Sequence, residues 1–173
     1  MSTEKIIITL FAKDRPGIVR ALSDTVLANK GNWLESSLSR LCGQFTGIVH
    51  IAIDSGNRAQ LETSLGALSA DGIIVTFQNH DGVKTDDIEV NGVQIFVEAN
   101  DRPGIIKEIT QALEAENVNL DNIDTEVESA SMAGYQIFRA HMFLAMPDDL
   151  SEDDLEEIFA GVSSDVMVSI LEE

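Results

Sequence analysis

Two short segments with the same sequence have the residue types and spacing to bind an anion. Asp14-Arg15-Pro16-Gly17 and Asp101-Arg102-Pro103-Gly104 each follow an apolar run and precede a run with helical periodicity. A turn that leads into a helix leaves backbone N–H groups without partners at the helix start, and these groups attract anions. Glycine has no Cβ, so a ligand can approach the N–H groups closely. We name the segments the first and second DRPG turns and predict a small anionic ligand for at least one.

The pattern of elements around the two turns occurs twice along the chain. The second turn begins 87 residues after the first, at position 101 against position 14. Apolar alternation and helical spacing predict the same order of elements in both halves. The first half is expected to hold strands at 5–12, 32–42, 45–54 and 73–77 and helices at 16–30 and 57–70; the second half is expected to hold strands at 92–99, 119–129, 134–145 and 166–170 and helices at 103–116 and 151–162.

Several local signals refine these elements. Pro16 suits the first helical position because its ring fixes φ, which would make Arg15 the N-cap. Gly31 suits the left-handed backbone conformation that is common where a helix ends. Ser151 and Asp154 match a capping box at the last helix. Each helix has a stripe of residues expected in the core, namely Ile18, Leu22 and Val26; Leu61, Leu65 and Leu68; Ile105, Ile109 and Leu113; Leu155, Phe159 and Val162.

The hairpins of the two halves are expected to differ in length. Gly43 and Gly134 are 91 residues apart, as are His50 and His141. If these residues are equivalent, the second hairpin is four residues longer. The two histidines lie at strand positions without a second nearby His or Cys, so packing is favoured over metal binding, and no metal or cofactor is expected.

The order βαββαβ, repeated, predicts an α+β protein made of two ferredoxin-like domains with antiparallel sheets. The domains are expected at 1–79 and 92–173, with a polar linker at 80–91. Right-handed crossovers place both helices of a domain on one sheet face. Ile7 and Phe11 point to the other face, so the first sheet should be apolar on both sides. Pairing by sheet faces or sheet edges, within the chain or in a homo-oligomer, is therefore predicted.

Charge and composition limit the classes of partner. The 173 residues carry a net charge of −19, with 44% hydrophobic and 24% charged residues. Residues 1–80 hold seven basic and seven acidic side chains, so the second half carries the whole charge. Direct binding to DNA or RNA is disfavoured, since phosphates would be repelled. The acidic half either maintains solubility or docks a basic protein.

Location is also suggested by the sequence. No apolar run is long enough for a membrane span, and the N-terminal residues do not resemble a signal peptide. A lone Cys42, expected half-buried in a strand, is compatible with a reducing compartment. A cytoplasmic protein without membrane contact is predicted.

The duplicated pattern resembles the ACT domain, a ligand-binding module of amino-acid metabolism. The matching segments are DRPGIV with its helix and Gly31-Asn32-Trp33-Leu34 in the first half, and DRPGII with Val118-Asn119-Leu120 in the second. The stretch DRPGIVRALSD…NWLESSLSRLCGQFTGIVHI is most similar to the glycine cleavage system transcriptional repressor family. The resemblance implies two tandem ACT domains.

The resemblance also implies ligand residues at each DRPG turn and at the start of the second strand, usually at an interface between ACT units. With the adjoining arginines and helical N–H groups, the candidates are Asp14, Arg15, Pro16, Gly17, Ile18 and Asn32, and Asp101, Arg102, Pro103, Gly104, Ile105 and Asn119. Amino-acid-binding members often have asparagine where Asp14 and Asp101 stand. Aspartate accepts a hydrogen bond from an ammonium but cannot donate one to a carboxylate. The alternative is that Asp14 and Asn32 only stabilise the loop.

Three functions are open at this point. The first is a non-catalytic regulator that senses a glycine-like amino acid and controls transcription through a protein partner, such as a DNA-binding transcription factor, without binding DNA itself. The second is an enzyme of the acylphosphatase type, for which Arg15 and Asn32 supply the residue types. The third is a ligand-free oligomerisation module.

Overall fold

The chain forms two compact units, residues 1–85 and 86–173, in a computed structural model that describes residues 2–79, 91–129 and 135–171. We name them the first and second units. The predicted linker at 80–91 lies outside the described residues, except for Asn91 at the start of a strand.

Each unit contains four strands and two α-helices in the predicted order. The first unit comprises β1 (Thr3–Lys13), α1 (Ile18–Ala28), β2 (Asn32–Leu41), β3 (Gln44–Asp54), α2 (Ser55–Ala67), the 3-10 helix η1 (Leu68–Asp71) and β4 (Ile73–Asn79). The second comprises β5 (Asn91–Asn100), α3 (Ile105–Ala115), β6 (Asn119–Ser129), β7 (Gln136–Met146), α4 (Glu152–Val162) and β8 (Met167–Leu171).

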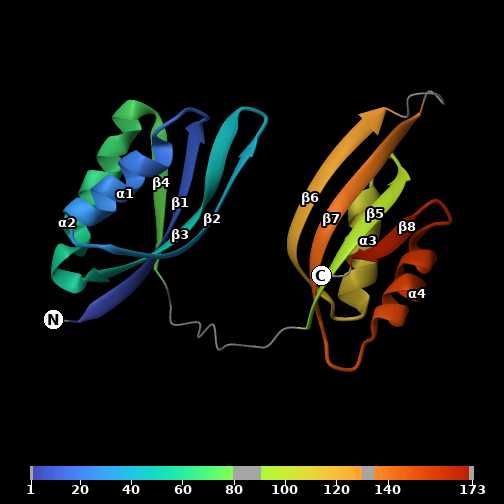
Figure 1. Cartoon of the computed structure of the whole chain (residues 1–173). Coiled ribbons are helices and arrows are strands. Elements are labelled where there is room, and N and C mark those ends of the chain that lie inside the picture. Colours follow the sequence, from blue (N-terminus) through green and yellow to red (C-terminus); the bar gives the residue numbers. More distant parts are fainter. Residues whose placement is uncertain (1, 80–90, 130–134, 172–173) are drawn as a thin grey trace. The chain divides into compact units, whose positions relative to one another are not determined.

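The strand orders are β2-β3-β1-β4 and β6-β7-β5-β8, and every neighbouring pair is antiparallel. In Figure 1 both helices of each unit lie on one side of its sheet. These are two ferredoxin-like domains, so the predicted fold class is confirmed. The strands β2 and β6 each lie at an edge of their sheet.

The core of each unit lies between the helices and one sheet face. Ile18, Leu22 and Val26 of α1 are buried, as are Leu61 and Leu65 of α2. Leu68 and Val162 are only half-buried. The other predicted core residues, Ile105, Ile109, Leu113, Leu155 and Phe159, are buried in the second unit. Spacing along the sequence therefore identified the buried helix faces correctly, apart from the last residue of each second helix.

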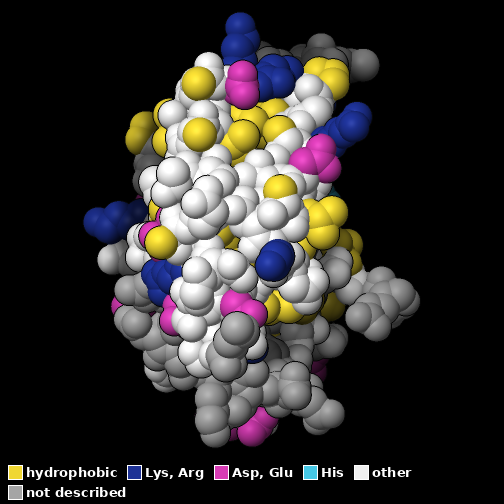
Figure 2. Space-filling view, turned by 90° about the vertical axis from the view of Figure 1, so that its left-hand side faces the viewer, with side chains coloured by type: hydrophobic (Ala, Val, Ile, Leu, Met, Phe, Trp, Pro, Cys, Tyr) yellow, Lys and Arg dark blue, Asp and Glu magenta, His cyan; other side chains and the backbone are white. Residues whose placement is uncertain are grey.

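The opposite face of the first sheet is apolar, as predicted. Phe11, Ile48 and Ile74 are each about half exposed there, at 50%, 51% and 55%. Ile7 is half-buried on the same face, beside His50. The exposed side of the helical layer of the first unit also carries hydrophobic side chains, which Figure 2 shows among uncharged side chains, backbone and scattered charged residues. Val19 and Leu27 of α1 contribute to that side.

The helix after each DRPG turn begins later than predicted. Gly17 and Gly104 are the N-caps, each with φ 95°, so Pro16 is not the first helical residue and Arg15 is not the cap. A left-handed N-cap admits glycine far more readily than any residue with a Cβ. The prediction for the helix end was also wrong, because Lys30 (φ 60°) is the left-handed residue there. Gly31 is instead required for space, since a Cβ would lie 2.9 Å from Val26 Cγ1.

The strand registers correct the predicted equivalence of the histidines. Ile7 pairs with His50, and Gln94, 87 residues further on, pairs with Phe143. His50 therefore corresponds to Phe143, 93 residues later, and His141 corresponds to Ile48. The second hairpin is six residues longer than the first, not four. Gly134 lies outside the described residues.

The first hairpin turns at Cys42 and Gly43, with φ 50° and 74°. Two left-handed residues are what a type I′ turn requires, and such a turn matches the twist of the paired strands. Cys42 is therefore exposed in a turn, and its predicted place inside a strand was wrong. No helix among the described residues is long and apolar enough to cross a membrane.

Candidate functional site

The first DRPG turn presents an uncapped helix start to solvent. The Asp14 N–H donates to the Gly43 carbonyl at 2.9 Å, which ties the turn to the β2–β3 hairpin. No side chain caps α1, and its first turn contains no acidic residue. A Cβ on Gly17 would have no described atom within 4 Å, so the space beside the helix N-terminus is open. The N–H groups and the helix dipole together favour an anion at this point.

Two arginines lie near the first turn, and both already have partners. Arg15 Nη2 donates to the Asp71 carbonyl at 2.9 Å. Arg40 of β2 is 3.5 Å from Asp14 Oδ2. The hydrogen bond to Asp71 holds the Arg15 guanidinium at η1. Asp14 retains about a third of its side-chain exposure, so its carboxylate remains accessible to a cation.

The second DRPG turn has the same backbone but a different charge. Arg102 donates to both carboxylate oxygens of Glu108, in the first turn of α3, at 2.8 and 2.6 Å. These hydrogen bonds hold the pKa of Glu108 below its ordinary value, so Glu108 is ionised at neutral pH. Asp165 lies nearby and accepts from the Asn100 N–H at 3.3 Å. By strand and helix register, Ala21 and Gly72 stand at the corresponding positions of the first unit. Anion binding is therefore disfavoured at the second turn.

The two asparagines predicted to complete the sites lie at the far end of each sheet. Asn32 pairs with Ala52, whereas the first turn adjoins Gly43 at the other end of β3. The eight residue-to-residue steps from Gln44 to Ala52 span about 27 Å at the usual rise of an antiparallel strand. In the second unit, Asn119 likewise pairs with Ala145 near one end of β7. The Asp101 N–H donates a hydrogen bond to the Gln136 carbonyl at the other end. Neither unit alone brings its turn and its asparagine together.

This separation also bears on the enzyme alternative. Arg15 is held at η1, at the same end of the sheet as the first turn, and Asn32 lies at the opposite end. Within one unit the two residues therefore do not form the joint phosphate site that an acylphosphatase needs. Among the described residues there is also no group of three or more His, Cys, Asp or Glu placed to hold a metal.

A hollow of about 320 Å³ lies where α3 ends and β6 begins. Asn119 is part of its lining, and its side-chain amide donates to Asp121. The whole lining consists of Thr110, Leu113, Glu114, Asn117, Val118, Asn119 and Leu120. The start of the second strand is thus concave in the second unit, as a ligand site at this point would require.

The two edge strands differ in charge. On the outer face of β2 the side chains are Glu35, Ser37 and Ser39, and on β6 the corresponding residues are Asn122, Asp124 and Glu126. Further acidic residues of β6 are Asp121 and Glu128. Like charges on an edge oppose pairing with another strand. The edge of the first unit is therefore much better suited to strand addition than that of the second.

Comparison with known proteins gives a consistent assignment of family. Residues 4–78 and 93–160 each match a model described as "ACT domain". A crystal structure of an unknown protein from Galdieria sulphuraria has 22% identity and a TM-score of 0.82, covering 99% of both chains. A candidate glycine cleavage system transcriptional repressor has 20% identity and a TM-score of 0.72, covering 99% of this chain and 98% of its own. No curated protein matches the sequence.

Proposed function

Because the chain belongs to the ACT-domain family, with two tandem copies, we propose that it is a regulatory protein that senses a small amino acid such as glycine. In this proposal it controls transcription through a protein partner in the cytoplasm and does not bind DNA. The observation that carries the sensing role is the first DRPG turn, an open helix N-terminus without a capping side chain and without an acidic residue in the first turn of α1.

The α-carboxylate of the amino acid is bound by the N–H groups that follow Gly17, at the positive end of the α1 dipole. The ammonium group is bound by the Asp14 carboxylate, which is about a third exposed. An aspartate suits this role because it can only accept hydrogen bonds.

The distant asparagine joins the site through a second copy of the chain. If β2 pairs antiparallel with β2 of another copy about its centre at Ser36 and Ser37, then Asn32 of one copy lies opposite Leu41 of the other. Leu41 directly precedes the hairpin turn at Cys42 and Gly43, and the Gly43 carbonyl accepts a hydrogen bond from the Asp14 N–H. Such pairing adds the carboxamide to the first turn of the neighbouring copy. The acidic edge of β6 would oppose the same pairing in the second unit.

Calorimetry with glycine, alanine and serine tests the ligand role. We expect binding by the native chain and a loss of about fivefold or more in affinity for Ala21→Glu, because a carboxylate at a helix N-terminus opposes the bound anion. Glu108→Ala is the matched control in the second unit and should leave the affinity unchanged. The absence of heat with every amino acid, together with no thermal shift, would refute the sensing role.

The regulatory role rests on family membership, on the charge of the chain and on the likeness to a candidate repressor. A net charge of −19 opposes contact with a phosphate backbone, so a partner must provide DNA binding. Affinity capture from cell extract at low salt should recover a DNA-binding protein, and a gel-shift assay with the purified chain alone should show no complex. DNA binding by the chain alone would contradict the proposal.

A further inference from the structure

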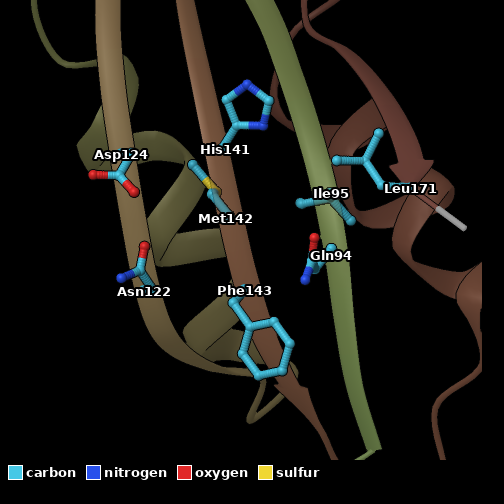
Figure 3. Close-up of a pocket in the computed structure, with 8 residues that line it drawn as sticks. All are labelled: Gln94, Ile95, Asn122, Asp124, His141, Met142, Phe143 and Leu171. Atoms are coloured by element: carbon cyan, nitrogen blue, oxygen red, sulfur yellow. The ribbon is translucent and has the colours of Figure 1, made fainter. Parts of the chain in front are cut away.

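The outer face of the second sheet contains a hollow that is separate from both DRPG turns and from the Asn119 hollow. Its volume is about 240 Å³, below the usual range for sites of drug-sized ligands, so only a small metabolite would fit. Figure 3 shows its lining, which comes from all four strands of the sheet. The lining residues are Gln94, Ile95, Asn122, Asp124, His141, Met142, Phe143 and Leu171.

Two aromatic rings leave this space open by leaning in opposite directions along β7, as Figure 3 shows. Phe143 lies over Gly92, where a Cβ would come within 2.3 Å of the ring. His141 leans instead against Phe96, with ring centroids 4.7 Å apart. The absence of a side chain at Gly92 therefore determines where the Phe143 ring can lie. The gap between the rings is the hollow.

Polar side chains border the hollow, and only Asp124 among them carries a full negative charge. Asp124 makes no ion pair within the described residues. Directly across from Asp124 on β7 stands His141, and Arg139, two residues before it, is already bound by Glu98 at 2.8 Å and by Glu128. Asn122 and Gln94 add carboxamides that can donate or accept. A carboxylate without a counter-ion beside an aromatic ring favours a cation.

The first unit lacks this arrangement, although it has the same fold. Lys5 stands at the position of Gly92, and Ser37 at that of Asp124. His50 replaces Phe143, and its Nδ1 is 2.8 Å from Glu35 Oε1. The features that open the hollow thus belong to the second unit and are not a consequence of the ferredoxin-like fold.

We propose that this hollow binds a small organic cation, with its ammonium group on Asp124 and its apolar part between Phe143 and His141. The site is independent of the amino-acid site proposed at the first turn, since it shares no residue with it. Its chemistry is also different, because a free carboxylate on the ligand would be repelled by the acidic surroundings of β6.

Isobutylamine and uncharged isobutanol, titrated into the ¹⁵N-labelled full chain, provide the test. Isobutylamine should shift the amide signals of residues 94–96, 122–124 and 141–143, and isobutanol should shift them far less. Asp124→Asn should weaken isobutylamine binding about tenfold, as expected for the loss of a charge-assisted hydrogen bond. Glu126→Gln makes the same change of charge two residues along the same strand face, outside the hollow, and should weaken binding less than twofold.

Gly92→Ala provides a second test, because it changes the shape of the hollow. The new Cβ should push the Phe143 ring toward the hollow and reduce isobutylamine binding without removing any charge. A thermal unfolding curve close to the native one shows that this variant is folded; if it is not, Asp124→Asn and Glu126→Gln decide the question alone. The proposal would be overturned if Asp124→Asn and Glu126→Gln weakened isobutylamine binding equally. It would also be overturned if isobutanol bound as well as isobutylamine, or if isobutylamine did not bind.

Discussion

Ala21 and Glu108 stand at equivalent places in the helices that follow the two DRPG turns, and they give those turns opposite electrostatics. Glu108 brings a carboxylate to the start of α3, where it is bound by Arg102. Ala21 leaves the start of α1 open, and Arg15 turns instead toward the Asp71 carbonyl. Two copies of one sequence motif therefore have different capacities to bind an anion.

Gly17→Ala should destabilise the first unit by about 1–2 kcal/mol, the usual cost of a left-handed residue with a Cβ. The cost arises from the backbone alone, since a Cβ at Gly17 meets no described atom. Urea unfolding measures this change. Gly56→Ala is the control, because Gly56 lies in α2 with open space and ordinary φ, and it should leave stability unchanged or raise it by about 0.5–1 kcal/mol. Equal effects of the two substitutions would contradict the role assigned to Gly17.

Residue types predicted the turn but could not give the first residue of its helix. Proline at the first helical position and glycine at the N-cap are both common. A Pro-Gly sequence therefore allows two starting points, and only the backbone angles distinguish them. Residue types also could not show how far Asp14 lies from Asn32 within one unit. This separation follows from α1, which returns the chain to the other end of the sheet before β2 begins.

At the scale of elements, α4 depends on a capping box at its first turn. The Asp154 carboxylate accepts from the Ser151 N–H at 2.7 Å and from the Ser151 hydroxyl at 2.6 Å. The predicted pairing of these residues is confirmed. Ser151→Ala should cost about 1 kcal/mol of unfolding free energy. Denaturant titration at pH 7 measures it, and a change below about 0.3 kcal/mol would show that the cap is dispensable.

The same cap predicts a dependence on pH. Hydrogen bonds from the Ser151 hydroxyl, and then from its N–H, hold the pKa of Asp154 below its ordinary value of 3.8. A carboxylate with a lowered pKa stabilises the fold above that ordinary value and loses its contribution as pH falls through the lowered pKa. Asp154→Asn should therefore destabilise the chain at pH 7 and matter less below about pH 3.8. Asp153→Asn, at an exposed neighbour, is the control for the loss of one negative charge at this helix start.

The strands show how much of a fold can be predicted from the alternation of apolar and polar residues. Apolar residues at every second position identified the two faces of β1 correctly. The predicted offset of 91 between the hairpins differs from the observed 93 by two residues. A shift of two leaves every side chain on the same face, so alternation cannot distinguish these registers. The length of a hairpin loop is free to vary, and the equivalence of His50 and His141 was therefore mistaken.

For the whole molecule, the two units share a fold but differ in the surfaces that they offer to partners. The first unit has an apolar outer sheet face and a serine-rich edge, and the second has an acidic edge. The overall charge of −19 hides this difference, because all of it belongs to the second half.

Self-association should depend on the edge of the first unit. Ser37→Glu with Ser39→Glu places like charges on β2 and should weaken association of two copies at least tenfold, as measured by sedimentation at several concentrations. The matched change in the second unit, Asp124→Ser with Glu126→Ser, removes charge from β6 and should not weaken association. A native chain that stays monomeric at all concentrations would contradict the pairing, as would an unchanged mass for the β2 variant.

The central claim is that an amino acid binds at the first DRPG turn and not at the second, and the backbone amides at the two turns report on this directly. A ¹⁵N NMR titration of the full chain with glycine follows both sites in one sample. We predict large, saturable shifts for Gly17, Ile18 and Val19, and none for Gly104, Ile105 and Ile106. Saturable shifts confined to the second turn, or no shifts at either turn with any small amino acid, would contradict this account.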